Sequence, residues 1–124
     1  MKMTDTKLLD SSIWLDYFYN GNHKNIIDSD EIVLMSVISL YEIKKKLSLK
    51  NSQNKVDMAI QKVKERSLII PIENEIAEKA VEVSMKHNLP MADSIIYATA
   101  LIHKGIVVTL DKHFKKLDKV IFFE

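Results

Sequence analysis

The chain has no cysteine, which excludes disulfides, thiolate metal sites and cysteine nucleophiles. The same absence is typical of proteins kept in a reducing cytoplasm, and we expect that location. No apolar run approaches the roughly 18 residues of a membrane-spanning helix, so we expect no membrane partner. The chain also has little net charge, because 18 basic and 17 acidic residues give +1 at pH 7. Total charge therefore indicates no nucleic-acid partner by itself.

The pattern of apolar runs predicts one α/β domain over residues 1–124. Of the 124 residues, 47% are hydrophobic, enough for one core, and no repeat, low-complexity tract or linker interrupts them. Short β-branched runs alternate with stretches that have helical spacing. The predicted strands are residues 7–9, 31–35, 67–72, 106–110 and 120–123. Their alternation with helices predicts a three-layer α/β/α sandwich with a mainly parallel central sheet.

Two predicted strands end at an aspartate. Asp10 follows the first strand and precedes Ser11, Ser12 and a helix, and Asp111 follows the strand over residues 106–110. Such residues most often only cap helices. In an open parallel sheet, however, ligands collect beyond the carboxyl ends of the strands. Two carboxylates at equivalent strand ends are more than capping requires.

Two further acids lie on predicted helices. Glu42 lies just over one turn into a helix that begins after Ser36, where it borders the apolar face, although most helical glutamates are solvated. Asp93 opens a helix that is apolar almost all round and therefore belongs in the interior. An acid near the core must be a cap, a paired charge or a ligand.

Basic residues gather in one part of the chain, between residues 44 and 66, where Asp57 and Glu65 are the acids. Such a run is usually a solvated helical face. It begins directly after Glu42, however, so it also qualifies as a surface for a phosphate backbone. The basic residues are Lys44, Lys45, Lys46, Lys50, Lys55, Lys62, Lys64 and Arg66.

Four separated pieces of the sequence resemble the motifs of PIN-domain ribonucleases, and more narrowly of VapC-type toxins from bacterial toxin–antitoxin pairs. They are residues 9–12 (Leu-Asp-Ser-Ser), 36–42 (Ser to Tyr-Glu), 92–94 (Ala-Asp-Ser) and 109–114 (Thr-Leu-Asp-Lys-His-Phe). They span nearly the whole chain in the family's order. One position departs from the pattern: many members carry a further acid two residues after the fourth, and this chain has His113.

The resemblance implies a PIN-like fold and a divalent-metal-dependent endoribonuclease that acts as a toxin, with Mg²⁺ or Mn²⁺ as cofactor. It implies that Asp10 and Asp93 bind the first metal ion and that Glu42 and Asp111 orient water or share a second ion. Ser12 and Thr109 would hydrogen-bond to the carboxylates or to the substrate phosphate. The chemistry agrees, since these ions prefer oxygen ligands and lower the pKa of bound water.

The implied partners are an RNA substrate, a VapB-type antitoxin and a second copy of the chain in a homodimer. Cleavage by this family implies ends that bear a 5′-phosphate and a 3′-hydroxyl. Among the lysines, Lys44, Lys45 and Lys46 are our candidates for RNA contact. The remaining histidines, His23, His87 and His103, have no clustered ligand spacing, and we interpret them as surface residues.

Two alternatives stay open at the level of sequence. The first keeps the fold but not the reaction, as a catalytically inactive PIN-like module that binds RNA or protein. The presence of all four acids argues against it. The second is an aspartate-phosphorylated α/β domain. Phosphatases of that kind need an aspartate two residues after the nucleophile, where this chain has Ser12. Signalling receivers need an acidic pair before the end of the first strand, and this sequence has no such pair.

Overall fold

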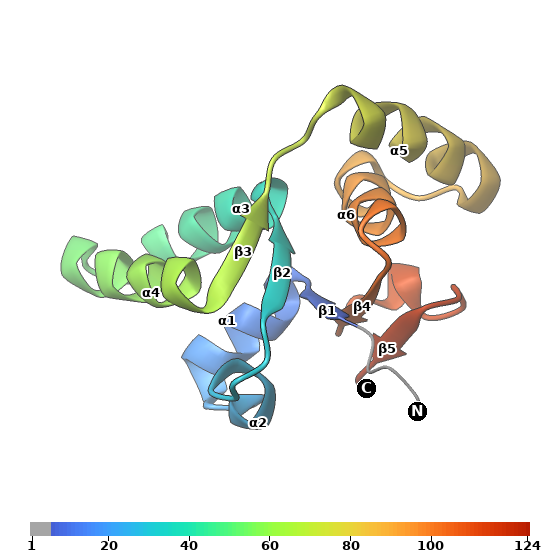
Figure 1. The fold of residues 1–124 in the computed structure, drawn as a ribbon. Helices are drawn as coiled ribbons and strands as arrows, with labels where there is room; N and C mark the ends of the chain where they lie inside the picture. The colour runs from blue at the N-terminus through green and yellow to red at the C-terminus, as the bar shows by residue number, and fades with distance from the viewer. Residues whose placement is uncertain (1–5) are drawn as a thin grey trace.

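The computed structural model describes residues 6–124 and has a five-stranded sheet with helices on both faces (Figure 1). The elements, in chain order, are β1 (Thr6–Leu9), α1 (Ser11–Asn20), α2 (Lys24–Ile27), β2 (Val33–Ser36), α3 (Val37–Ser48), α4 (Gln53–Arg66), β3 (Ser67–Ile70), α5 (Asn74–His87), α6 (Met91–Ile102), β4 (Gly105–Thr109), the 3₁₀ helix η1 (Lys112–Phe114) and β5 (Val120–Phe122). Within residues 6–124, no helix has the length and apolar character needed to cross a membrane.

The sheet has the strand order β3-β2-β1-β4-β5, and every neighbouring pair is parallel. The chain builds outward from β1 to β2 and β3, and then returns to place β4 on the other side of β1. The order of strands therefore reverses between β1 and β4, where Leu9 is paired with Val108. Crevices at such switch points, outside the carboxyl ends of the strands, are where open α/β sheets bind ligands.

Two apolar clusters fill the space on the two faces of the sheet. Leu8 and Val107 face α5 and α6, whereas Leu9 and Val108 face α1, α3 and α4. Neighbouring residues of a strand point to opposite faces, so each buried strand needs apolar residues in succession. Figure 1 shows the result, with α5 and α6 on one side of the sheet and α1 to α4 on the other. The expected α/β/α sandwich is confirmed, and its sheet is wholly parallel.

Several element boundaries differ from those predicted. The polar stretch after residue 23 contains a short helix, α2, that no apolar periodicity announced. β2 begins at Val33 instead of Glu31, and β3 ends at Ile70, before Pro71. α6 begins at Met91, two residues before Asp93, which was predicted to open it. Asp93 still lies in the first turn of α6, so the difference leaves this acid in place.

The interpretation of His23 as a surface residue is wrong. Its side chain is only 10% exposed, and its Nε2 lies 2.7 Å from an oxygen of Asp16 on α1. The ring also packs edge-to-face against Phe123, next to β5. His87 is half-buried against Tyr97, whereas His103 is exposed as predicted. His23 thus links the middle of α1 to the residue that follows β5.

Candidate functional site

The fold brings the four predicted acids together at the switch point between β1 and β4. Asp10 follows β1, Glu42 lies on α3, Asp93 on α6, and Asp111 between β4 and η1. Their charges act on one another: Asp111 raises the pKa of Asp10, of Glu42 and of Asp93. Acids from four separate parts of the chain therefore share one electrostatic site.

Asp10 is buried, with 3% of its surface exposed, and its carboxylate is held by three donors. Oδ1 accepts from the backbone N–H of Ser11 at 2.8 Å, which caps α1. Oδ2 accepts from the hydroxyls of Thr109 at 2.7 Å and Ser12 at 3.0 Å. Asp10 therefore caps the helix and belongs to the acidic site at the same time. Oδ1 caps α1, and Oδ2 binds the hydroxyls of Ser12 and Thr109. Burial is the largest influence on the pKa of Asp10 and raises it.

The two predicted supporting residues, Ser12 and Thr109, also fix the backbone around the site. Ser12 Oγ accepts from the N–H of Leu110 at 3.0 Å, and Thr109 Oγ1 accepts from the N–H of Asp111 at 2.9 Å. Both hydroxyls therefore donate to Asp10 and accept from the chain that leads to Asp111. These bonds couple the ends of β1 and β4.

Ser11 joins Glu42 to the same network. Its hydroxyl donates to Glu42 Oε1 at 3.1 Å and lies 3.5 Å from Asp10 Oδ1. Sequence reasoning gave Ser11 only a capping role. The missing signal was three-dimensional: α1 and α3 follow adjacent strands and pack together, which brings residue 11 beside residue 42. Glu42 itself is half-buried, and burial raises its pKa.

Asp93 and Asp111 meet through His113. The imidazole Nδ1 lies 2.9 Å from Asp93 Oδ2 and 3.0 Å from Asp111 Oδ1. Burial, the charge of Asp111 and the charge of Asp10 raise the pKa of Asp93 to about 7, whereas His113 lowers it. Asp111, and after it Asp93, raises the pKa of His113. The sequence marked residue 113 only as a departure from the family's pattern, and the structure places it inside the acidic site.

The candidate lysines Lys44, Lys45 and Lys46 are exposed on α3, the helix that carries Glu42. Lys46 is one helical turn beyond Glu42, and its charge lowers the pKa of that carboxyl. Lys45 lies over the ring of exposed Tyr41, with 5.7 Å between Nζ and the ring centroid. Of the three lysines, Lys46 therefore acts on the acidic site through its charge.

The residues present fit a hard divalent cation. The site offers carboxylate oxygens at close quarters, and the raised pKa values of three of them reflect burial and mutual repulsion that a cation relieves. Asp93, Asp111 and His113 each offer one ligand atom, and these atoms lie within 4.8 Å of one another. Oxygen-rich sets of this kind suit Mg²⁺ and Mn²⁺.

The electrostatics predict how stability depends on pH when metal is chelated. A carboxyl whose pKa rises on folding binds protons more tightly in the folded state, so the free energy of unfolding falls as pH rises from about 4 through about 7. Each group contributes a slope of at most about 1.4 kcal/mol per pH unit. We expect Asp93→Asn to melt above the wild type at pH 8 in EDTA and to lose this advantage toward pH 5. The prediction would be contradicted if the melting midpoints of the wild type and of Asp93→Asn, plotted against pH, ran parallel to each other.

Comparison with known proteins agrees with this architecture. No curated protein matches the chain. Among solved structures, a toxin–antitoxin complex from Klebsiella pneumoniae matches with a TM-score of 0.78 and 24% identity, over 94% of this chain and 96% of that one. VapBC2 from Rickettsia felis, bound to a DNA fragment from its promoter, gives 0.77 and 16%, over 95% and 97%. The sarcin-ricin loop cleaving toxin VapC20 of Mycobacterium tuberculosis gives 0.76 and 16%, over 93% and 97%.

At these identities the solved structures establish a shared fold. The sequence itself matches the PIN domain family over residues 7–120, which includes all four acids and the whole sheet except the first residue of β1 and the last two residues of β5. This chain therefore belongs to the PIN domain family.

Proposed function

We propose that the protein is a divalent-metal-dependent endoribonuclease and the toxin of a toxin–antitoxin pair. The observation that carries the proposal is the convergence of Asp10, Glu42, Asp93 and Asp111 at the switch point of a PIN sheet. Two structural neighbours come from toxin–antitoxin complexes, and a third is a toxin that cleaves RNA. Such an activity belongs in the cytoplasm, where the RNA is.

In this proposal the metal is held by Asp10 and Asp93, with Asp111 and Glu42 sharing it or a second ion. A bound Mg²⁺ or Mn²⁺ would lower the pKa of a water molecule that it binds and would neutralise charge on the phosphoryl oxygens. The chain itself keeps the carboxylates in position. Thr109 and Ser12 hold Asp10 by two hydroxyl donors, and Ser11 holds Glu42. Because these groups are fixed before substrate arrives, little reorganisation is needed during the reaction.

Removal of one carboxylate charge tests the proposed activity. Asp93→Asn keeps the shape of the side chain but deletes a proposed metal ligand, so we expect RNA cleavage in Mn²⁺ to fall by at least about a hundredfold. Asp10→Asn should act in the same direction. Glu78→Gln, an exposed residue of α5, makes the same change away from the site and should leave the rate unchanged. The assay follows labelled RNA with Mn²⁺ or EDTA.

If the wild type folds and binds RNA yet cuts none with any divalent metal, the chain is an inactive PIN-like binding module. If the wild type cleaves RNA and both aspartate variants cleave it at the same rate, the proposal that these carboxylates carry the reaction is wrong.

The lysines on α3 supply the flanking positive surface that a carboxylate site needs to hold a polyanion. Lysine is a flexible point charge that suits a phosphate backbone and reads bases poorly. The exposed side chains of Lys44, Lys45 and Lys46 extend from the helix that carries Glu42. RNA bound at the acids therefore passes close to them.

Replacement of Lys44, Lys45 and Lys46 by Gln should weaken RNA binding for all sequences alike. Because each phosphate contact contributes about −0.7 to the slope of log K against log salt, the slope should flatten by up to about 2. Binding is measured at several salt concentrations with Ca²⁺ in place of Mg²⁺ to suppress cutting. A control variant changes three exposed lysines elsewhere, Lys24, Lys86 and Lys104, to Gln. If both variants lost the same RNA affinity, the loss would come from the change in net charge and not from the position of Lys44, Lys45 and Lys46.

The proposed protein partners are a VapB-type antitoxin and a second copy of the chain. An arginine fits the acidic site, since its guanidinium pairs bidentately with carboxylates and excludes a metal ion. The second copy is supported by an apolar surface on α5 and α6. Val81, Met85 and Met91 are 62%, 82% and 75% exposed there, beside a cavity of about 370 Å³. Burial of such a patch is a common basis for association.

Co-expression with the neighbouring gene product tests the antitoxin. We expect a stable complex whose cleavage of RNA is suppressed, and recovery of cleavage when the partner is removed by denaturation and refolding. Sedimentation of the toxin alone should give twice the mass of one chain. A monomer that no neighbouring gene product inhibits would leave a stand-alone nuclease.

A further inference from the structure

His113 is the one residue of the acidic site that offers a nitrogen. Its Nδ1 lies 2.9 Å from Asp93 Oδ2 and 3.0 Å from Asp111 Oδ1. Ligand atoms held about 2.1 Å from a single ion lie about 3 to 4 Å from one another. The spacing of these three atoms, all within 4.8 Å, therefore suits common coordination of one ion.

The backbone holds His113 and Asp111 as a unit. Asp111 Oδ1 accepts from the N–H of His113 at 2.9 Å, and Thr109 Oγ1 accepts from the N–H of Asp111 at 2.9 Å. The next residue, Phe114, is fully buried and anchors η1 in the core. The side chain of His113 is itself 59% exposed, so packing does not require an imidazole at this position. Its contacts are with the two carboxylates.

We infer that His113 is a nitrogen ligand of the ion held by Asp93 and Asp111, and that it shifts the selectivity of the site from Mg²⁺ toward first-row transition metals. Mg²⁺ takes oxygen ligands and keeps its waters, whereas imidazole is a good ligand for Fe²⁺, Co²⁺, Ni²⁺ and Zn²⁺. The inference rests on the proposed function in one respect, because it requires this site to bind a metal.

A different role for His113 makes a different prediction. As a counter-charge only, the imidazole would neutralise Asp93 and Asp111 and be displaced by any ion. Its removal would then strengthen the binding of Mg²⁺ and of Co²⁺ by the same factor. As a ligand, its replacement by an oxygen donor weakens Co²⁺ binding relative to Mg²⁺ binding. The ratio of the two dissociation constants therefore separates the two roles.

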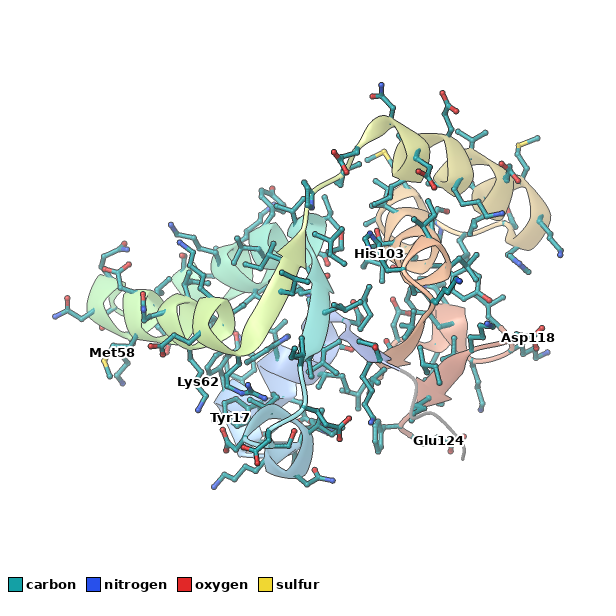
Figure 2. All side chains as sticks on the ribbon, in the orientation of Figure 1. Tyr17, Met58, Lys62, His103, Asp118 and Glu124 are labelled. Atoms are coloured by element: carbon teal, nitrogen blue, oxygen red, sulfur yellow. The ribbon has the colours of Figure 1, made fainter. Side chains whose placement is uncertain are left out.

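The experiment titrates the full chain with MgCl₂ and with CoCl₂ in a calorimeter, for wild type and His113→Asp. The aspartate gives an all-oxygen set at the same position. We expect the preference for Co²⁺ over Mg²⁺ to fall by at least about tenfold in His113→Asp. The control is His103→Asp, the same change at an exposed histidine at the other end of α6 from Asp93, labelled in Figure 2. It should leave the preference unchanged.

Pulsed electron paramagnetic resonance of the Mn²⁺-loaded protein gives a second readout that does not depend on affinity or cleavage. The wild type and His103→Asp should both show modulation from a coordinated imidazole nitrogen, and His113→Asp should lose it. An unchanged metal preference, or nitrogen modulation that persists in His113→Asp, would overturn the inference while metal binding and cleavage remain intact. Failure of the wild type to bind any of these ions would overturn the inference together with the proposed metal-dependent function on which it rests.

Discussion

The arrangement of the site depends on the burial of one carboxylate. Asp10 can lie at the interior end of β1 only because Thr109, Ser12 and the N–H of Ser11 satisfy its oxygens. A buried carboxylate without such donors would cost several kcal/mol. Those donors come from β4 and from the first turn of α1. Because the oxygens of Asp10 need these hydrogen-bond donors, the positions of β1 and β4 relative to each other are fixed. These are the two strands between which the strand order reverses.

The acids also set a limit on stability. Four carboxylates at one sheet edge repel one another, and the chain offsets this with hydroxyl donors, with His113 and with Lys46 beside Glu42. None of these groups neutralises the site completely, as the raised pKa of Asp93 indicates. The apolar clusters on both faces of the sheet supply the stabilisation that offsets this repulsion. Such a cost is common where a protein keeps charges ready for chemistry.

The sequence predicted the parallel sandwich because its strands are short, β-branched and separated by helices with clear apolar periodicity. It also predicted that the four acids lie close together, since three of them sit at strand ends or in a first helical turn, where position along the chain determines position in the sheet. It missed α2, whose four residues carry too little periodicity to detect. Ser11 and His113 were missed as parts of the site for another reason. Their contacts join residues 31 and 20 positions apart, and only tertiary packing creates them.

The pairing of β1 with β4 has a consequence for the synthesis of the protein. The bond between Thr109 and Asp10 spans 99 positions of the chain, and β1 lies directly beside β4 in the sheet although β2 and β3 come between them in the sequence. During translation β1 and β2 leave the ribosome well before β4, and the acidic site has no fourth carboxylate until Asp111 follows. A nascent chain that ends before residue 111 therefore lacks one of the four acids, and the acidic site is complete only after that residue has been synthesised.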